Sequence, residues 1–276
     1  MRSSSDLNEN ITCQPFLKWA GGKRWFVRNH LQIAPSQFNH YFEPFLGGAS
    51  MYFALRPRTA TLSDFNANLI NCYIQIREAP KVVHTFLVDH HFKHCKDYYY
   101  QIRASRFEDP IERAAQFIYL NRTCWNALYR VNLKGEFNVP IGTKTNVLLD
   151  TDNFDNISNI LNNAQILSCD FEETINKASN NDFIFVDPPY TVKHNNNGFV
   201  KYNETMFSWE DQIRLSESLK KAHFRGVKFL MTNAYHQSVI DLYKDEFQLT
   251  KVSRHSVIAS QSVRRGIYDE LLVKNY

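Results

Sequence analysis

The sequence predicts an α/β protein built on a mostly parallel sheet, with a mainly helical segment inserted into it. Short apolar runs alternate with helical patterns, which is typical of a doubly wound sheet. That alternation breaks over residues 72–163, which are aromatic, basic and rich in His. We therefore expect a sheet-forming domain made of residues 1–71 and 164–276, and an insertion at 72–163.

The first part has the pattern of strand, glycine turn, helix, strand, helix. Residues 39–45 favour a strand that runs into a turn at 46–50, and residues 51–55 favour a helix. A second strand at 60–63 ends at Asp64, and the segment after it carries an apolar stripe at helical spacing.

The later apolar runs at 165–168, 183–186 and 227–232 are short and are each followed by polar or turn residues, as buried parallel strands are. The C-terminal stretches 248–257 and 268–274 alternate and favour an antiparallel pair. A parallel sheet with an antiparallel C-terminal hairpin is expected.

A capping box of the form S-x-x-D spans Ser208 to Asp211 and predicts the start of a crossover helix. We expect Ile213, Leu215 and Leu219 on or near its buried side.

The insertion favours helices near 80–90 and 111–122 and a polar hairpin around 133–136. An insertion after the second strand lies beside the crevice at the carboxyl ends of the strands, where such sheets bind ligands. Its expected role is substrate selection.

Composition excludes several classes of protein. The 276 residues are 43% apolar and 14% aromatic, which is enough for a large core and not typical of a disordered chain. No apolar run is long enough to cross a membrane, and the N-terminus lacks the apolar stretch of a secretory signal. Five scattered Cys residues without a C-x-x-C pair favour reduced thiols, so a cytoplasmic location is expected. A monomer is favoured, although the sequence does not determine the oligomeric state.

Charge is distributed unevenly. Residues 1–145 contain 18 Lys and Arg against 11 Asp and Glu, whereas residues 146–276 contain 14 against 17. A basic half is expected when one face meets a polyanion such as nucleic acid, and ordinary surface variation is the alternative.

The strongest motif is D-P-P-Y at 187–190, directly after the predicted strand 183–186. Two prolines end the strand and leave carbonyl oxygens able to accept hydrogen bonds. Asp187 and the Pro188 carbonyl can accept both hydrogens of an exocyclic amine, which favours a nucleophilic nitrogen, and Tyr190 offers a stacking face. A simple strand-ending turn is the alternative.

Two other strand ends offer candidate nucleotide contacts. The turn after Phe45 contains Gly47 and Gly48, which permit close backbone approach, and Asp64 suits ribose hydroxyls. Asp170 and Phe171, after the strand 165–168, suit an adenine amine and ring.

The spacing of His90, His94 and Cys95 would allow a metal-binding site, but ligands on one short segment rarely converge tetrahedrally. We expect solvated or DNA-facing histidines there, and no metal.

Together these motifs resemble the DNA adenine methyltransferases of the Dam type, over most of the chain. The resemblance rests on 16–23 (FLKWAGGK), 43–45 (EPF), Asp64, 119–122 (YLNR), 135–140 (GEFNVP), 187–190 (DPPY) and 269–272 (DELL). It implies a Rossmann-like sheet that binds S-adenosylmethionine (AdoMet) and a helical recognition insertion with a β-hairpin. The implied reaction is methyl transfer to the N6 amine of a flipped adenine in double-stranded DNA, within GATC or a closely related site.

The resemblance also implies roles for individual residues. The AdoMet pocket would comprise Trp19, Lys23, Phe45, Gly47, Gly48, Asp64, Asp170, Phe171 and Asp187. The adenine site would comprise Asp187, Pro188 and Tyr190.

For DNA, the resemblance implies that Lys18 reads the first guanine of GATC. Trp125 would wedge into the duplex, Asn126 would compensate at the vacated pair, and Leu128, Arg130 and Pro140 would belong to the recognition hairpin. Arg can grip guanine with two hydrogen bonds, and an apolar side chain can meet the thymine methyl.

Two positions depart from the family pattern. The usual turn is F-x-G-x-G, whereas here the second glycine falls one place early and Ala49 follows. Trp125 stands at the wedge, where other aromatic residues are common.

Two alternatives stay open at this point. One keeps the fold and changes the acceptor to a cytosine amine, RNA or a protein amide. The other is a DNA-binding module without catalysis. The sequence does not determine whether a restriction enzyme accompanies the protein.

Overall fold

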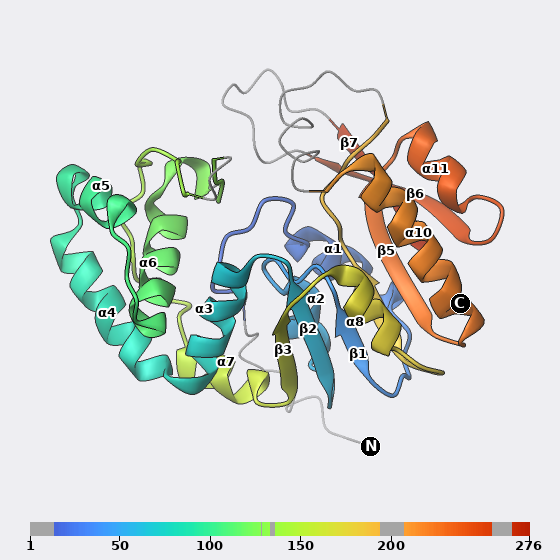
Figure 1. The fold of residues 1–276 in the computed structure, drawn as a ribbon, viewed down its shortest axis with the longest axis horizontal. Helices are drawn as coiled ribbons and strands as arrows, with labels where there is room; N and C mark the ends of the chain where they lie inside the picture. The colour runs from blue at the N-terminus through green and yellow to red at the C-terminus, as the bar shows by residue number, and fades with distance from the viewer. Residues whose placement is uncertain (1–13, 128, 133–135, 194–206, 256–266) are drawn as a thin grey trace. The chain divides into compact units, whose positions relative to one another are not determined.

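The computed structural model describes residues 14–127, 129–132, 136–193, 207–255 and 267–276. Within these ranges the chain forms a seven-stranded sheet with the order β3-β2-β1-β4-β5-β7-β6 (Figure 1). The strands are β1 (Tyr41–Glu43), β2 (Ala60–Asp64), β3 (Ala164–Ser168), β4 (Phe183–Val186), β5 (Lys228–Ala234), β6 (Gln248–His255) and β7 (Ile267–Lys274).

The sheet is mixed, as predicted. β1 pairs in parallel with β2 and with β4, and β4 pairs in parallel with β5. β7 is antiparallel to both β5 and β6, so the predicted C-terminal pair is confirmed. β4 therefore lies at the centre of the strand order, with β1 and β5 as its neighbours.

Strand β1 is shorter than the predicted strand at 39–45. The backbone N–H of Asn39 bonds to Asn181 O, and that of His40 bonds to the Asp182 carboxylate, both in the turn before β4. At the other end, Pro44 has no N–H to continue the ladder. Turn chemistry therefore shortens the strand at both ends.

The helices are α1 (Arg24–His30), α2 (Ser50–Leu55), α3 (Ala67–Glu78), α4 (Pro80–Lys93), α5 (Lys96–Ala104), α6 (Pro110–Thr123), α7 (Phe154–Leu161), α8 (Phe171–Lys177), α10 (Trp209–Phe224) and α11 (Gln237–Tyr243), with short 3₁₀ turns η1 (Leu31–Ile33) and η2 (Trp125–Ala127). The helices predicted near 80–90 and 111–122 are confirmed as α4 and α6. Helix α5 was not predicted, since its N-cap is the weak acceptor Cys95 Sγ, 3.5 Å from Tyr98 N.

The chain divides into two compact units. The first unit comprises Met1–Leu31, Gly47–Pro57 and Asn66–Ile166, and the second comprises Gln32–Leu46, Arg58–Phe65 and Leu167–Tyr276.

The core of the second unit lies between the sheet and helices α8, α10 and α11. Apolar side chains of β4, β5 and β7 pack there against the apolar faces of these helices. They include Ile184, Val186, Phe229, Met231, Leu271 and Val273 from the strands, and Ile175, Leu215, Leu219 and Val239 from the helices.

Helix α10 begins with the predicted capping box. Ser208 Oγ accepts from Asp211 N at 3.1 Å, and the Asp211 carboxylate accepts from Ser208 N at 2.9 Å. Leu215 and Leu219 are buried as expected, but Ile213 is 38% exposed, so the prediction for Ile213 is wrong. Its neighbour Gln212 takes the inward position instead.

In the first unit, α6 packs against α3 and α4, and α7 packs against the same two helices. At the end of α6 the Arg122 side chain is fully buried, with paired bonds of 2.6 and 2.7 Å to the Asp152 carboxylate. It also donates to the backbone oxygens of Phe16 and Val147. One guanidinium thus ties two loop segments to one helix.

The predicted hairpin around 133–136 falls partly outside the described residues. On either side of the gap, Val131 and Phe137 form an isolated antiparallel bridge, and Asn132 N donates to Glu136 O at 2.8 Å. The flanking chain is therefore paired as a hairpin would be.

Candidate active site

The D-P-P-Y motif begins at the carboxyl end of β4, as the sequence predicts. Asp187 is half-buried and Pro188 is buried. The Asp187 carboxylate accepts from Thr232 Oγ1 at 2.7 Å. Thr232 is fully buried on the neighbouring strand β5, so this bond orients the carboxylate from the protein interior.

Tyr190, at the other end of the motif, is half-buried. Its hydroxyl donates to Glu270 Oε2 on β7 at 2.8 Å. Burial raises the pKa of Tyr190 well above its ordinary value, and the nearby carboxylates of Asp187 and Glu270 raise it further. The phenol therefore stays neutral and keeps its proton for this bond.

Strand β2 also ends at candidate site residues. Asp64 is its last residue and is half-buried. The next residue, Phe65, is 82% exposed, which is unusual for a large aromatic side chain. Sequence reasoning did not single out Phe65, although an apolar residue directly after a strand-ending acid was a visible signal.

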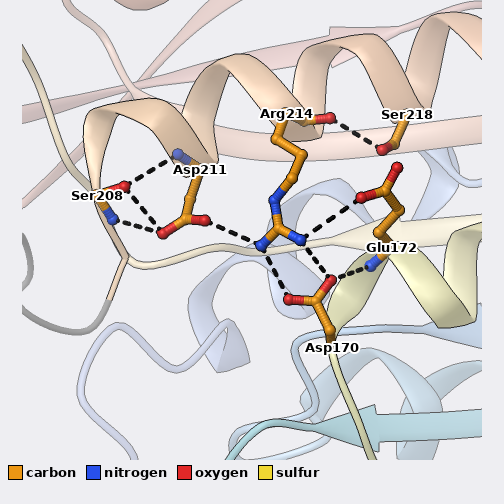
Figure 2. A network of polar contacts seen from close by, with 6 residues as sticks. All are labelled: Asp170, Glu172, Ser208, Asp211, Arg214 and Ser218. Atoms are coloured by element: carbon orange, nitrogen blue, oxygen red, sulfur yellow. Dashed lines mark hydrogen bonds and ion pairs between the residues drawn. The ribbon is translucent and has the colours of Figure 1, made fainter.

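Asp170 stands after β3 as the N-cap of α8, where its Oδ1 accepts from Glu172 N at 2.9 Å. Figure 2 shows the guanidinium of Arg214 between Asp170 and Asp211. Its two terminal nitrogens donate to the two Asp170 oxygens at 3.0 and 2.9 Å, and one of them also donates to Asp211 at 2.9 Å. Arg214 thus links α10 to the N-terminus of α8.

The Arg214 network favours ionised acids. Although burial acts in the opposite direction, hydrogen bonds from the Ser208 backbone and from Arg214 hold the pKa of Asp211 below its ordinary value. Arg214 also lies over the ring of Phe171, 4.4 Å from its centroid. Arg214 therefore contacts both the acid and the ring at the N-terminus of α8 and balances the negative charge of Asp170.

Two predicted pocket residues are brought together in the second unit. The rings of Phe45 and Phe171 are stacked, with centroids 5.3 Å apart and planes 24° apart. Phe171 is buried and Phe45 is half-buried.

In the first unit, Trp19 packs on the glycine turn. A Cβ added at Gly47 would lie 2.7 Å from Trp19 Cδ1, and the φ of Gly47 is +44°. Ala49 also has a positive φ, +53°, at the place where the family pattern has its second glycine. The turn thus keeps a left-handed conformation at 49 without glycine.

Trp19 is stacked on its other side by Tyr129, with centroids 5.6 Å apart and planes 19° apart. Tyr129 in turn contacts Phe117 and Phe137. A column of rings therefore joins Trp19 to the segment that carries Arg130.

Lys18 is held through its backbone. Its N–H donates to Asn121 Oδ1 at 3.0 Å, and its carbonyl accepts from Asn121 Nδ2 at 2.7 Å. Burial lowers the pKa of the Lys18 ammonium, as do the cations Lys144, Arg122 and Arg24. The half-buried ammonium lies in a positive field suited to an anionic or electron-rich partner.

Lys23 is not a surface charge, because its side chain is only 3% exposed. Its Nζ donates to Gly21 O at 2.7 Å, at the end of the A-G-G-K turn.

The two ends of the segment 124–141, which contains most of the predicted DNA contacts, are hydrogen-bonded to each other. Cys124 and Ile141 form a bridge, and Trp125 N donates to Pro140 O at 2.9 Å. The Trp125 side chain is 51% exposed and Asn126 has a φ of +54°.

Further along this segment, Arg130 Nε donates to Asn138 Oδ1 at 3.1 Å. Leu128 lies outside the described residues.

The expectation for the His cluster is wrong at His90, which is buried and bonded through Nδ1 to the Tyr98 hydroxyl at 2.7 Å. His94 bonds to the Tyr119 hydroxyl at 2.8 Å. Tyrosines from α5 and α6, which the sequence could not place beside α4, supply these partners. In the described part of the chain no cluster of three or more His, Cys, Asp or Glu could hold a metal ion.

Several residues with site contacts were missed from the sequence. Arg214, Thr232 and Glu270 lie far along the chain from the residues they hold, so only the fold brings them together. Asn121 was part of the family pattern without a role. One signal was available for Glu270, which is an acid directly before the apolar run Leu271 to Val273.

Among the described residues, no helix combines the length and the hydropathy that a membrane span requires.

Comparison with known proteins adds independent evidence. The chain is 37% identical over 275 residues to the type II methyltransferase M1.LlaDCHI of Lactococcus lactis subsp. cremoris, with 96% of each chain covered. It is 35% identical to the type II methyltransferase M.MjaIII of Methanocaldococcus jannaschii, covering 95% of this chain and 99% of that one. It is 29% identical to the DNA adenine methylase of Escherichia coli strain K12, with 93% of each chain covered.

Residues 19–258 match the family described as D12 class N6 adenine-specific DNA methyltransferase. Since this match spans most of the chain and contains the D-P-P-Y motif, the chain belongs to the D12 class of N6 adenine-specific DNA methyltransferases, as its motifs predict.

Proposed function

We propose that this protein transfers the methyl group of AdoMet to the N6 amine of an adenine flipped out of double-stranded DNA. The observation that carries the proposal is the buried support of D-P-P-Y at the end of the central strand, where Thr232 orients Asp187 and Glu270 holds Tyr190. Both ends of the motif are thus preorganised, as catalysis by positioning requires.

The residues at three strand ends of the second unit suit AdoMet. Asp64 would accept from the ribose hydroxyls, and the exposed ring of Phe65 would provide a stacking surface for the adenine. Asp170 would accept from the adenine amine. Arg214 and Glu172 N together use about three of the four lone-pair sites of that carboxylate, so capacity for one further donor is left on Oδ2 among the described contacts.

The remaining cofactor contacts would come from Phe45 and Phe171 in the second unit and from the first unit. In the first unit we assign Trp19, Lys23, Gly47 and Gly48 to AdoMet. The buried Lys23 ammonium would meet the carboxylate of the methionine part, because the two groups carry opposite charges.

When bound, AdoMet supplies an electrophilic methyl group on a sulfonium. Asp187 and the Pro188 carbonyl would accept the two N–H groups of N6, which concentrates electron density on that nitrogen. The N6 lone pair forms the new C–N bond as the C–S bond breaks, its electron pair returns to sulfur, and N6 then loses one proton to solvent. Tyr190 would stack on the flipped base.

For DNA, we propose that residues 72–163 act as a recognition insertion. Trp125 would enter the duplex as a wedge, with Asn126 and Pro140 beside it. Leu128 and Arg130 would contact base edges, and Lys18 would contact the first guanine of GATC. The cations around Lys18 support the last assignment because guanine presents two acceptors in the major groove.

The test uses purified protein, AdoMet tritiated on the methyl group, and duplexes that differ only in whether they contain GATC. We expect label in N6-methyladenine after digestion to nucleosides, and only with the GATC duplex. Absence of label from every duplex would overturn the activity. Label in cytosine would overturn the acceptor, and equal label in both duplexes would overturn the site specificity.

The relatives include proteins named as type II methyltransferases and others named as DNA adenine methylases. We propose that the protein protects the DNA of the cell that carries it by methylating one short sequence. Methylation-sensitive digestion of DNA from cells that express it would reveal the protected sequence, and unprotected DNA would contradict this role.

A further inference from the structure

We propose that Glu270 is a positioning residue for methyl transfer: from β7 it fixes the ring of Tyr190 in the orientation that receives the flipped adenine. This inference rests on the proposed function and names a residue outside D-P-P-Y on which the reaction depends.

The strand register places Glu270 where it can do this. Glu270 lies opposite Ala234 of β5, and Thr232 lies two residues before Ala234 on the same strand. Side chains two apart on a strand, and those directly opposite across an antiparallel pair, share one face of the sheet. Thr232 and Glu270 therefore project from the same face.

On that face the two residues bond to opposite ends of the D-P-P-Y motif. Thr232 donates to Asp187 at 2.7 Å, and Glu270 accepts from Tyr190 at 2.8 Å. The opposite face of the same strands carries Met231, Leu271 and Val273, which pack into the apolar core. Thr232 and Glu270 therefore support D-P-P-Y from one face of the sheet.

Burial argues that Glu270 does more than fill space. Its side chain is 2% exposed, and a buried carboxylate is stable only when it is well hydrogen-bonded. An apolar residue of similar size would serve packing alone at least as well. The phenol donates to the carboxylate, and this bond holds the tip of the ring in place. Because a phenolic O–H prefers to lie in the plane of the ring, the bond also favours one ring plane.

A fixed ring plane matters because the base has to stack with its N6 aimed at the methyl group. Misplacement of reacting groups by about 1 Å lowers rates by about 100-fold. Loss of the Glu270 bond should therefore lower the rate of the chemical step without removing the ring that stacks.

The experiment measures single-turnover methylation of a GATC duplex by the full chain, together with equilibrium binding of AdoMet and of DNA. Glu270→Leu removes the acceptor, and we expect the single-turnover rate to fall about 10- to 100-fold. Binding constants for AdoMet and DNA should change by less than about 3-fold. Glu270→Gln keeps an acceptor oxygen, so it should restore most of the rate.

The matched control is Asp269→Asn. Asp269 is the neighbouring acid on the same strand, but its carboxylate pairs with Lys251 at 2.7 Å and accepts from Ser253 Oγ at 2.6 Å. Its rate should equal that of the wild type. An equal loss in both variants would overturn the inference, since it would indicate a general effect on the strand.

A second variant covers the case in which Glu270→Leu does not fold. Tyr190→Phe removes the same bond from the other side and keeps the ring, so it should show the same fall in rate. In the double variant with Glu270→Leu the loss should be well below the combined losses of the two single variants, because both changes remove the same bond.

A duplex with 2-aminopurine at the target adenine supplies a readout of stacking. The flipped base should still become fluorescent with Glu270→Leu, but with quenching by Tyr190 altered from the wild type. A folded Glu270→Leu or Tyr190→Phe variant with unchanged rate and quenching would overturn the inference. Inactivity of the wild type towards all DNA would instead overturn the proposed function.

Discussion

At the scale of the residue, the structure explains how a short motif becomes a site. Asp187 is not simply exposed at a strand end, because Thr232 holds one of its oxygens and sets its direction. Tyr190 keeps its proton because burial raises its pKa, so the phenol acts as a donor and not as a phenolate. Chemistry at this site therefore depends on orientation more than on unusual acidity.

Replacing Asp187 by Ala removes an acceptor for the reacting amine. We expect turnover to fall by at least about 100-fold, in the range seen when one preorganised polar group is removed from an active site. DNA affinity, measured by fluorescence anisotropy, should change by less than about 3-fold. Unchanged turnover would contradict the role of Asp187.

A second prediction at this scale concerns the glycine turn. Ala49 has a φ of +53°, and a left-handed conformation costs a non-glycine residue about 1–2 kcal/mol. Ala49→Gly should relieve this and raise the free energy of unfolding by about 0.5 kcal/mol, after the entropy cost of glycine.

Gly47→Ala is the opposing control for this turn. Its new Cβ would lie 2.7 Å from Trp19 Cδ1 at a φ of +44°, so it should destabilise by about 1–3 kcal/mol. Urea titrations of both variants test the pair, and shifts of the same sign would contradict the account.

At the scale of the element, one side chain connects two helices. Arg214 on α10 binds Asp170 at the N-terminus of α8 and lies over Phe171 (Figure 2). Its side chain is 39% exposed, so the ion pair itself contributes little stability. Its importance lies in fixing the direction of Asp170.

Arg214→Met should therefore weaken AdoMet binding about 10-fold while lowering the free energy of unfolding by about 1 kcal/mol or less. Isothermal calorimetry measures the affinity. Lys220→Met is the matched control, because Lys220 forms an ion pair of similar exposure on the same helix with Glu246. Equal affinities for the two variants would contradict the assignment of Asp170 to the adenine amine.

At the scale of the whole molecule, a buried His makes stability depend on pH. Burial lowers the pKa of His90 to about 4, and Asp89 opposes the effect only in part. An exposed His titrates near 6.5, so between pH 6.5 and 4 the unfolded chain binds more protons than the folded chain. The contribution of neutral His90 is complete above pH 6.5 and is lost as the pH falls towards 4.

We expect the free energy of unfolding to fall by up to about 1.4 kcal/mol per pH unit within this window because of His90. His90→Gln should flatten the slope in urea titrations at pH 7, 6 and 5. His91→Gln, which changes an exposed neighbour on the same helix, should leave the slope as in the wild type. Parallel slopes for wild type and His90→Gln would contradict the prediction.

Much of this protein follows from local sequence. Alternation and turn residues predicted β2, β4, β5 and the C-terminal pair, because a strand in a layered sheet has to alternate or to be apolar throughout. The capping box predicted the start of α10, since its hydrogen bonds are made within four residues. D-P-P-Y predicted where β4 ends, because two successive prolines have no N–H to continue the ladder of a central strand.

Only the tertiary structure decided which side chains support those motifs. Thr232 lies 45 residues from Asp187 and Glu270 lies 80 residues from Tyr190, so no local pattern could pair them. The same holds for the burial of His90, whose ring stacks on Tyr119 of another helix. Backbone hydrogen bonds and turn chemistry are short in sequence, whereas the partners of a buried polar group are set by strand order and helix packing.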